Sequence, residues 1–508
     1  MRKVKDGQKN IGKFIKMLRE RSGLTQSDLA KALKTSQSAM ARMEKGDQNF
    51  TTKLLSNISE ALGQNILSLS DTADFEIIGG KKLSGSITTN YSKNGSVGLL
   101  CASLLNKGMT RLHGISRIEE VNRLIKVFES IGVSIKWIGK NSIEIIPPKK
   151  FDLKKLNIDA ATKTRSAIMM IGALIHREKS FSFPHAGGCK MGERTIAAHK
   201  YGLGELNVSI TTHERGYEIT VDKQGLRINN IVMYEASDTA AENLLIAATL
   251  IPGATKIEFA TSNYQVQEVC FFLEVCGVKI DGIGTTTLVV HGINEINKTI
   301  EYHNSEDPIE SMMFISAAIV TDSKITVKRC PIDFLKLELL KLKYMGLKYA
   351  LSKEYVSWNK RTRIVDITVY PSKLKALTDK IHALPYPGIN SDNLPFFVPI
   401  ASKAEGTTMI HDWMWESRAI YFTELNRLGA KITLADPHRV FIEGVTELKG
   451  AQIVSPPALR PAMIILVAML GAKGRSILRN VYTINRGFEN IAERLRSIGA
   501  DIRVINSI

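Results

Sequence analysis

Residues 241–259 read Ala-Glu-Asn-Leu-Leu-Ile-Ala-Ala-Thr-Leu-Ile-Pro-Gly-Ala-Thr-Lys-Ile-Glu-Phe, an apolar helix sequence that ends in a turn and continues into a strand. Gly253 marks the end of the helix, because glycine adopts the left-handed conformation without steric cost, and β-branched residues follow it. Residues 244–248 are apolar on every side of a helix, which indicates that this helix is buried all round. The stretch therefore predicts a helix enclosed by strands.

The same pattern recurs along the chain. Five further copies lie at Ser96–Leu112, Ser166–Phe183, Ser311–Val327, Asn393–Ile410 and Arg460–Leu478. A second kind of helix-to-strand turn alternates with these copies, and we call the residue at its centre the pivot. Successive pivots are 69 to 83 residues apart and lie at Gly132, Asn207, Gly277, Gly346, Gly429 and Gly499. Six copies of a mixed helix and strand unit indicate internal duplication. Three plus three units predict an α/β (α+β) fold with two lobes, and the cleft between two lobes is a natural ligand site.

Composition and charge narrow the classes of function. Of the net charge of +18, residues 1–70 carry 13 Lys and Arg against 6 Asp and Glu, a net +7, which leaves +11 for the other 438 residues. A basic small segment is typical of a nucleic-acid-binding module, and a basic large domain fits anionic substrates. The sequence has no run of 18 apolar residues, so no membrane span is predicted. It has no His and Cys cluster either, so no metal site is predicted. The cysteines are odd in number and scattered along the chain, which fits reduced thiols in a cytoplasmic protein. They are Cys101, Cys189, Cys270, Cys276 and Cys330.

The first seventy residues predict a separate helical head. Apolar residues at helical spacing predict a first helix over residues 11–21. Thr25, with Asp28 three residues later, is typical of a capping box ahead of a second helix. Ser36 is the expected cap of a third helix, after only a short turn. Helix, tight turn and helix at this spacing predict a helix-turn-helix.

Over residues 11–69 the chain resembles the Cro/C1-type (XRE) helix-turn-helix family, in the pattern Leu24-Thr25-Gln26, Leu29-Ala30, Ser36, Ser38 and Met43-Glu44-Lys45-Gly46. The resemblance implies DNA binding by residues 1–70, with Gln26 close to the DNA backbone. It also implies that the major groove is read by Gln37, Ser38 and Arg42. Such domains usually bind paired half-sites as dimers, so a homodimer is expected. A helical bundle that makes protein contacts is the alternative.

Residues 184–194 read Pro-His-Ala-Gly-Gly-Cys-Lys-Met-Gly-Glu-Arg. The glycines admit a ligand close to the backbone, and the thiol of Cys189 is expected to ionise readily beside Lys190 and Arg194. An ordinary surface turn with a free cysteine is the alternative.

This loop, Gly-Gly-Cys-x-x-Gly-x-Arg, and the six repeats together resemble the enolpyruvyl transferase family. The resemblance implies a two-lobed inverse α/β barrel over residues 75–508, with six βαβαββ repeats, a lobe boundary near residue 300, and a first strand shared with the C-terminus. It implies transfer of enolpyruvate from phosphoenolpyruvate (PEP) to the 3′-hydroxyl of UDP-N-acetylglucosamine with release of phosphate, the first committed step of peptidoglycan synthesis. Neither a cofactor nor a metal is implied.

By the same resemblance, Cys189 is the general acid or the nucleophile toward PEP, and Asp392 is the base for the acceptor hydroxyl. Asp392 also fits the position of a helix N-cap, which is the alternative for that residue. Lys93 is expected to be catalytic and to join the cations around PEP. The other substrate-binding residues implied are Asn94, Arg165, Arg194, Arg418, Arg460, Arg486 and Ser237.

The sequence departs from the family on the acceptor side. Ala458 stands where the family has an aspartate before its Leu-Arg pair, Ala197 replaces an aspartate that reads uracil, Asp238 interrupts a Ser-Val-Gly loop, and Met169 replaces a tryptophan. Two functions therefore stay open: a transferase with a DNA-binding head, or a transcriptional regulator whose transferase-like body senses PEP or a UDP-sugar. Shikimate phosphate as acceptor is a weaker reading, because that branch has no Gly-Gly-Cys loop.

Overall fold

A computed structural model describes residues 2–21, 24–48, 50, 54–55, 57–58, 61, 73–185, 187 and 195–506. Cys189 and Arg194 lie outside the described residues. Three separate apolar cores account for the buried side chains, one in the head and one in each of two lobes. None of the described helices combines the length and the hydropathy that a membrane crossing requires.

The head contains three described helices: α1 (Arg2–Arg21), α2 (Gln26–Ala32) and α3 (Gln37–Lys45). The expected capping box is confirmed, because Asp28 N donates to Thr25 Oγ1 at 3.2 Å and Thr25 N donates to Asp28 Oδ2 at 2.9 Å. Helix α1 begins earlier than expected, at Arg2 rather than residue 11. Lys, Arg and Gln favour a helix without adding the apolar periodicity on which that expectation rested.

A buried ion pair joins α1 to α3. Arg19 Nε donates to Glu44 Oε1 at 2.5 Å and Arg19 Nη2 donates to Glu44 Oε2 at 3.1 Å, with both side chains under 10% exposed. Gln26 Nε2 also donates to Glu44 Oε2, at 2.8 Å. Burial raises the pKa of Glu44, but the hydrogen bonds from Arg19 and Gln26 outweigh it and hold the pKa below its usual value. One carboxylate thus joins all three helices.

Lobe 1 is one continuous stretch of chain between α5 and β13. Its elements are α5 (Lys93–Ser103), β3 (Thr110–His113), α6 (Glu119–Ser130), β4 (Ser134–Trp137), β5 (Ser142–Ile146), η2 (Leu153–Lys155), α7 (Ile158–Thr162), η3 (Arg165–Met170), α8 (Ile171–Leu174), β6 (Ser180–Pro184), α9 (Ala197–Gly204), β7 (Val208–His213), β8 (Gly216–Val221), β9 (Asn230–Val232), α10 (Asp238–Ala248), β10 (Gly253–Glu258), α11 (Tyr264–Val275), β11 (Lys279–Asp281), β12 (Thr287–Gly292) and β13 (Ile300–His303).

Lobe 2 combines the first two strands of the body with the C-terminal part of the chain. Its elements are β1 (Ala73–Gly79), β2 (Ser84–Thr88), α12 (Pro308–Val320), β14 (Lys324–Pro331), η4 (Ile332–Phe334), α13 (Lys336–Tyr344), β15 (Lys348–Leu351), β16 (Tyr355–Val356), β17 (Arg363–Tyr370), β18 (Leu374–Lys375), β19 (Ile381–His382), η5 (Leu394–Phe396), α14 (Phe397–Ala401), β20 (Ala404–His411), η6 (Ala419–Leu428), β21 (Lys431–Asp436), β22 (Arg439–Gly444), β23 (Gln452–Val454), α15 (Leu459–Gly471), β24 (Gly474–Arg479), α16 (Tyr482–Asn485), α17 (Ile491–Ser497) and β25 (Asp501–Asn506).

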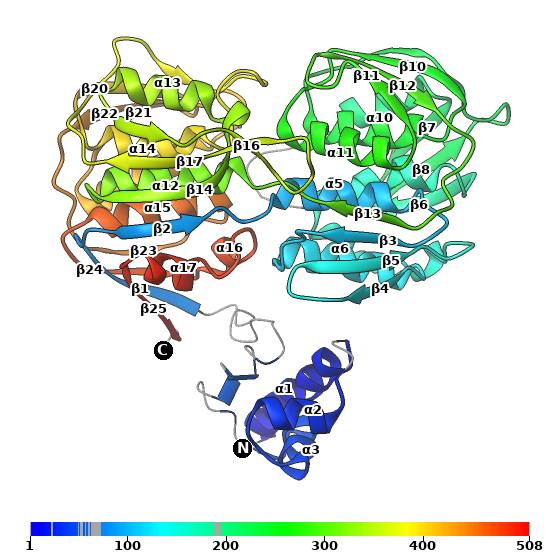
Figure 1. Ribbon diagram of the computed structural model, residues 1–508, viewed down its shortest axis with the longest axis horizontal. Coiled ribbons are helices and arrows are strands. Elements are labelled where there is room, and N and C mark those ends of the chain that lie inside the picture. Colours follow the sequence, from blue (N-terminus) through cyan, green and yellow to red (C-terminus); the bar gives the residue numbers. More distant parts are fainter. Residues whose placement is uncertain are drawn as a thin grey trace.

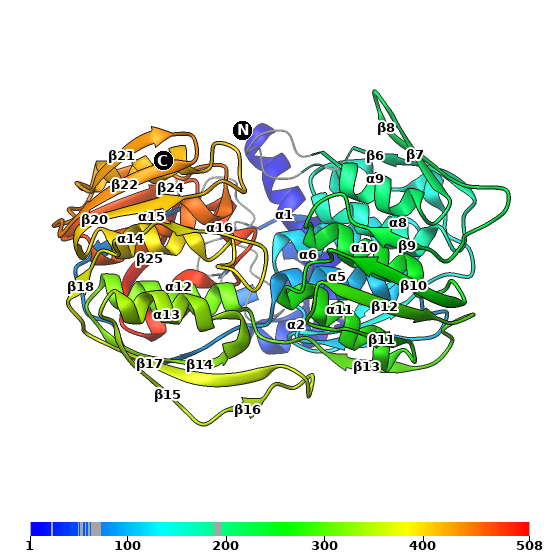
Figure 2. The same ribbon diagram turned by 90° about the horizontal axis from the view of Figure 1, so that it is seen from above.

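The strands form six sheets, three in each lobe, and the two lobes lie side by side (Figures 1 and 2). This confirms the expected repeat fold, although the described strands of a lobe pair as three separate sheets and do not close into one hydrogen-bonded barrel. The chain crosses between the lobes twice: β2, which pairs with β14 of lobe 2, leads into α5 of lobe 1, and β13, which pairs with β3 of lobe 1, leads into α12 of lobe 2. Strand β1 pairs with both β24 and β25.

Buried helices fill the interior of each lobe, as the apolar sequences predict. Every residue of α12 is buried, and α15 is buried along nearly its whole length and packs against α12. In lobe 1, α5 and α10 pack against α11. Four of the five cysteines are free thiols within these cores, and Cys189 lies outside the described residues.

All six predicted pivots adopt the left-handed conformation. Gly132 has φ 96° and Gly277 has φ 98°, and Asn207, the one exception to glycine, has φ 67°. Asparagine is a residue that tolerates this region. Each repeat unit therefore requires a left-handed backbone conformation at one position, the pivot.

The Arg19–Glu44 pair gives a test of the head's stability. We expect Glu44→Ala to lower the free energy of unfolding of the head by about 3–5 kcal/mol, because it leaves the buried Arg19 charge without its buried carboxylate partner. Hydrogen exchange of the α1 and α3 amides in the full chain measures this. The control Glu20→Ala removes an exposed partner of Arg19 and should cost less than about 1 kcal/mol. Equal effects of the two substitutions would contradict a dominant role for the buried pair.

Candidate active site at the lobe junction

The residues expected to act on substrate gather where the chain passes between the lobes. Residues 89–92 lead from β2 into α5, and residues 304–307 lead from β13 into α12. We refer to this region, with the chain that surrounds both passages, as the lobe junction. The first turns of α5, α11 and α15 and the loop before η5 contribute side chains to it, as the contacts below establish.

Lys93 begins α5 and is held by two carboxylates. Its backbone N donates to Asp307 Oδ2 at 3.2 Å, and its Nζ pairs with Glu120 Oε2 at 2.6 Å. Glu120 Oε1 also accepts from Ser166 Oγ at 2.8 Å. Burial raises the pKa of Glu120, but Lys93, Arg486 and Ser166 together outweigh it and bring the pKa to about 2. Glu120 is thus ionised, and it fixes the position of the Lys93 ammonium.

Asp392 lies between two arginines of lobe 2. Arg460 Nη2 donates to Asp392 Oδ2 at 2.9 Å, and Arg418 Nη1 lies 3.8 Å from Asp392 Oδ1. Burial raises the pKa of Asp392, but the charges of Arg460, Arg418 and Lys93 outweigh it and hold the pKa at about 2. The carboxylate faces Arg460, and η5 has no side-chain cap, so Asp392 does not act as the N-cap that its sequence position also fits.

Arg418 is fully buried and only partly satisfied. Its Nε and Nη2 donate to Asp412 at 2.5 and 2.7 Å, and Nη2 also donates to the Ser391 carbonyl at 2.7 Å. Its Nη1 has no hydrogen bond within the described part of the chain. Asp412 therefore orients a guanidinium that keeps one buried donor beside Asp392.

Lobe 1 presents a polar surface to this group of charges. Asn94 Nδ2 donates to Tyr264 Oη at 2.9 Å and to Gln265 Oε1 at 3.1 Å. Burial raises the pKa of Tyr264 well above its usual value, and the nearby carboxylates Asp307 and Asp392 add to the rise. The phenol therefore stays protonated and able to donate a hydrogen bond.

The start of α10 reaches the same junction. Ser237 caps α10, and its Oγ accepts from Ala240 N at 3.4 Å. Asp238 accepts from Asn263 Nδ2 at 2.8 Å, and Asn263 Oδ1 accepts across the lobes from Asn390 Nδ2 at 3.4 Å. Burial raises the pKa of Asp238, and the negative charge of Asp392 adds to the rise. Asp238 thus adds an acidic group to the side of the junction where the sequence departs from the family.

Arg165 and Arg486 lie at the edge of this group. Arg165 Nη2 donates to the carbonyl of Thr195, the first described residue after the Cys189 loop. On the other side of the loop, a Cβ on Gly187 would collide with the Thr162 carbonyl, so the base of the loop packs tightly against the end of α7. Arg486 is close enough to Glu120 to lower its pKa. Cys189 and Arg194 lie outside the described residues, so their assigned roles stay predictions.

Two of the family departures have a clear structural setting. Ala458 is buried at the N-cap position of α15, which has no side-chain cap, two residues before Arg460. Met169 is buried in the core of lobe 1 and gives no polar group to the junction. Ala197 begins α9.

Sequence reasoning missed Glu120, Asp307, Tyr264 and Asn263. Asp307 carried a local signal, since it precedes Pro308 at a helix start and accepts from the backbone N of Ile309 at 2.8 Å. Glu120 and Tyr264 carried none, because their partners at Lys93 and Asn94 are distant in sequence.

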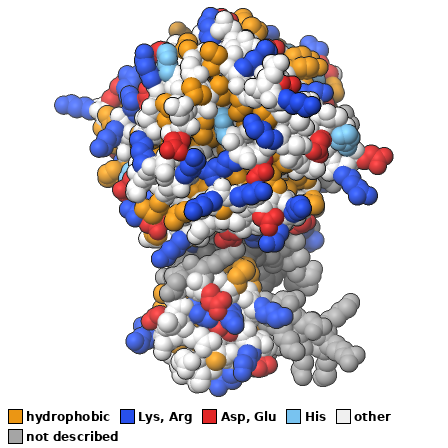
Figure 3. All heavy atoms as spheres, turned by 90° about the vertical axis from the view of Figure 1, so that its right-hand side faces the viewer, with side chains coloured by type: hydrophobic (Ala, Val, Ile, Leu, Met, Phe, Trp, Pro, Cys, Tyr) orange, Lys and Arg blue, Asp and Glu red, His pale blue; other side chains and the backbone are white. Residues whose placement is uncertain are grey.

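In the head, the residues expected to read DNA are accessible. Gln37, Ser38 and Arg42 are exposed on α3. Gln37 Nε2 donates to Gln26 Oε1 at 3.1 Å, which fixes the start of α3 against α2. On the outer face of lobe 1, by contrast, Lys and Arg are spread among acidic and apolar side chains (Figure 3).

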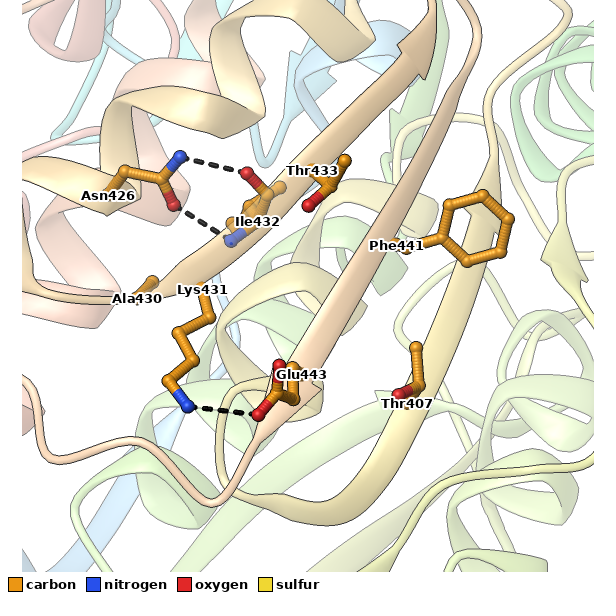
Figure 4. A pocket seen from close by; sticks show the side chains of 8 residues that line it. All are labelled: Thr407, Asn426, Ala430, Lys431, Ile432, Thr433, Phe441 and Glu443. Carbon is orange, nitrogen blue, oxygen red and sulfur yellow. Dashed lines mark hydrogen bonds and ion pairs between the residues drawn. The ribbon is translucent and has the colours of Figure 1, made fainter.

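A hollow of about 240 Å³ lies elsewhere, over β20, β21 and β22 of lobe 2 (Figure 4). Three of its polar side chains already pair: Lys431 Nζ with Glu443 Oε1 at 2.9 Å, and Asn426 Oδ1 with Ile432 N at 2.9 Å. The described residues contain no group of His, Cys, Asp and Glu that could hold a metal ion.

A family model for EPSP synthase (3-phosphoshikimate 1-carboxyvinyltransferase) matches residues 77–495, and a helix-turn-helix model matches residues 15–69. The UDP-N-acetylglucosamine 1-carboxyvinyltransferase of Treponema denticola is 33% identical over 440 residues, which cover 85% of this chain and 99% of the relative. The Caldanaerobacter subterraneus subsp. tengcongensis protein named UDP-N-acetylglucosamine 1-carboxyvinyltransferase 2 is 33% identical over 434 residues, 84% of this chain and 98% of its own.

Solved structures share the fold of the body. The enolpyruvyl transferase NikO from Streptomyces tendae superposes with a TM-score of 0.75 at 23% identity, and it covers 86% of this chain and 100% of its own. EPSP synthase from Acinetobacter baumannii superposes with a TM-score of 0.67 at 20% identity over 86% of this chain and 100% of its own. The chain belongs to the EPSP synthase family of enolpyruvyl transferases, joined to an N-terminal helix-turn-helix domain.

Proposed function

We propose that the protein transfers enolpyruvate from PEP to the 3′-hydroxyl of UDP-N-acetylglucosamine with release of phosphate, the step that commits the sugar to peptidoglycan synthesis, and that its head binds DNA. The observation that carries the proposal is the Asp392 carboxylate, held between Arg460 and Arg418 at a junction that also holds Lys93. A base surrounded by cations fits the reaction of a hydroxyl with a polyanion. The names of the relatives support the choice of acceptor.

The cations at the junction are suited to PEP. The buried Nη1 of Arg418 donates no hydrogen bond to any described residue, and Arg460 and Lys93 are held in place by carboxylates. Phosphate and carboxylate groups bind guanidinium forks strongly, so PEP is expected to take up these donors. Cations fixed before the substrate arrives need little reorganisation during the reaction.

PEP binding would also prepare the base. While Arg460 donates to Asp392, the pKa of about 2 makes the carboxylate a weak base. Once a phosphate engages Arg460, the pKa of Asp392 rises and the carboxylate accepts the acceptor's hydroxyl proton more readily. The hydroxyl oxygen then bonds to C2 of PEP while C3 gains a proton, which the resemblance assigns to Cys189. Loss of a proton from C3 and of phosphate from C2 restores the double bond.

A second function is favoured by the intact head and by Ala458. The exposed α3 residues fit DNA reading, and Ala458 removes a carboxylate that the family carries beside Arg460. A body that binds PEP or a UDP-sugar without turnover would then control transcription through the head. Measurement of turnover separates this regulator from the enzyme.

We expect the native protein to release phosphate from PEP only when UDP-N-acetylglucosamine is present. Asp392→Asn should lower kcat by about 10²–10⁴-fold, because it removes the general base while keeping the shape of the side chain. Phosphate release measured in both proteins checks this.

The control Asp436→Asn makes the same change on the β21–β22 turn, where Asp436 pairs with Arg439, and should leave kcat unchanged. Absence of acceptor-dependent release in the native protein would sink the transferase proposal and leave the regulator.

The pH dependence tests the role of Arg460. In the native protein Asp392 has a lowered pKa of about 2. Its carboxylate is therefore ionised at neutral and mildly acidic pH, and it becomes protonated only in strong acid. Arg460→Gln removes the largest charge that lowers this pKa, so the acidic limb of kcat/KM should move upward by about 1–3 pH units. Ionisation of PEP affects both enzymes equally. Coinciding acidic limbs would show that Arg460 does not control Asp392.

The head gives a separate prediction. Native protein should enrich one sequence from a pool of random DNA duplexes, and Arg42→Ala should weaken binding to it by about 1–3 kcal/mol and relax the choice of base at one position. Arg427→Ala, an exposed arginine of lobe 2, is the control and should leave binding unchanged. Equal retention of all duplexes by native protein would contradict specific DNA binding.

A further inference from the structure

One hairpin of lobe 2 reaches across to lobe 1. Residues 352–363, which include β16 and turn back into β17, are here named the strap. The strap extends from its own sheet toward α11 and β13 of lobe 1 (Figures 1 and 2). It contacts lobe 1 through a set of buried polar side chains, which is unusual for the tip of a hairpin.

Glu268 of α11 is the centre of these contacts. Its Oε1 accepts from Tyr302 Oη at 2.9 Å and from Ser305 N at 3.1 Å, and its Oε2 accepts from Asn359 Nδ2 at 3.1 Å. All four residues are at most 9% exposed. One buried carboxyl group therefore joins a helix of lobe 1, the chain passing between the lobes, and the strap.

Asn359 has two separable functions within the strap. Its Oδ1 accepts from the backbone N of Arg361 and Thr362, at 3.0 and 2.9 Å, which builds the turn of the hairpin. Its Nδ2 crosses to Glu268 Oε2 at 3.1 Å and also donates to Thr362 Oγ1 within the hairpin, at 2.8 Å. Aspartate keeps the oxygen that accepts from both backbone amides, and its second oxygen can accept from the Thr362 hydroxyl, so the turn is preserved. The donor to Glu268 is lost, so the contact between lobes is broken.

Further contacts hold the strap on either side of Asn359. Ser357 Oγ donates to Glu306 Oε2 at 2.6 Å, within the passage between the lobes. Arg361 Nη2 pairs with Glu274 Oε2 at 2.6 Å, near the far end of α11. The strap is thus attached both to the passage and along α11.

Helix α11 connects the strap with the candidate active site. At its start, Tyr264 and Gln265 accept from Asn94, the neighbour of Lys93, and Asn263 accepts from Asn390, two residues before Asp392. Glu268 follows about one turn later, on the same rigid element. Movement of α11 relative to lobe 2 would therefore displace groups on both sides of the junction.

We propose that Asn359 and Glu268 are positioning residues for the reaction, because their contact fixes α11 against lobe 2 and so sets the spacing between the lobe 1 and lobe 2 groups of the active site. The proposal rests on the proposed transferase function for its kinetic consequence, and not for its structural one. Neither residue is placed against the reacting atoms.

The chemistry of the contact argues for a positioning role. Burial raises the pKa of Glu268 to about 7, against the hydrogen bonds from Ser305, Tyr302 and Asn359, which lower it. A buried carboxyl is a costly way to gain stability, since apolar side chains of similar volume often do as well or better. The buried carboxyl group does fix the position of the strap relative to α11, because a buried acceptor must meet its donors at defined positions.

The test compares Asn359→Asp with the exchanged pair Glu268→Gln plus Asn359→Asp in the full chain. The single substitution keeps the oxygen that builds the turn and sets two carboxyl groups against each other. We expect strap amides and those of the first turn of α11 to exchange hydrogen about tenfold faster or more. The exchanged pair restores one amide and one carboxyl group at the contact, and should return exchange to within about twofold of native.

Kinetics give the second measurement. In Asn359→Asp, we expect kcat/KM for PEP to fall about tenfold, mostly through KM, because the groups are intact but misplaced. The exchanged pair should recover it. Glu354→Gln is the control, since Glu354 belongs to the strap but pairs, within the described part of the chain, with Arg363 of its own hairpin, at 3.2 Å.

Hydrogen exchange needs no turnover, so it decides the proposal even if the protein proves not to be a transferase. Unchanged exchange of α11 in Asn359→Asp would overturn it. Faster exchange that the exchanged pair does not reverse, or spread evenly over lobe 2, would also overturn it by showing general destabilisation. If the protein is an active enzyme, faster hydrogen exchange of α11 together with unaltered KM and kcat would overturn the link to the active site.

Discussion

The passage of residues 304–307 between the lobes is the constraint on which the rest of the body depends. Lobe 2 combines β1 and β2 with the C-terminal part of the chain, so the chain must return from lobe 1 to lobe 2 here. The crossing is buried, so its polar groups must find partners. Asn304 donates to the Ser92 carbonyl at 2.8 Å, on the opposite passage. Glu306 pairs with Arg329 and accepts from Ser357, and Asp307 caps α12 while it accepts from the backbone of Lys93. One of the groups that satisfy the crossing, Asp307, therefore also positions Lys93 of the proposed active site.

The proposed active site is a set of charges balanced before substrate arrives. Glu120 holds Lys93, Asp412 holds Arg418, and Asp392 holds Arg460. Two of these pairs are internal scaffolding. The third joins the proposed base to a cation that PEP would also attract, so one substrate group can exchange places with one carboxylate. Binding and activation of the base are then a single electrostatic event.

Much of the fold could be predicted from local sequence. The pivots at Gly132 and Asn207 need a left-handed backbone, and Thr25 with Asp28 forms a cap within one turn, so each signal and its cause lie together. Lys93, Asp392 and Arg460 could be located only by family resemblance. Glu268 and Asn359 could not be predicted at all, because their sequence separation is 91 residues and neither lies in a pattern that indicates its partner. A contact that forms only when the two lobes come together leaves no periodic pattern in the sequence around either residue.

The pairing of β1 with β24 and β25 has a consequence for the order of events on the ribosome. The head emerges early, and lobe 1, which is one continuous stretch, emerges with all its own strands before most of lobe 2 is made. The head and lobe 1 each have their own core. Strand β1 follows the head directly, yet its partners are the last strands to be made. An apolar strand must therefore wait, unpaired, through nearly the whole of translation, and such a strand is open to wrong partners. The nascent chain's dependence on chaperones should be concentrated in this strand.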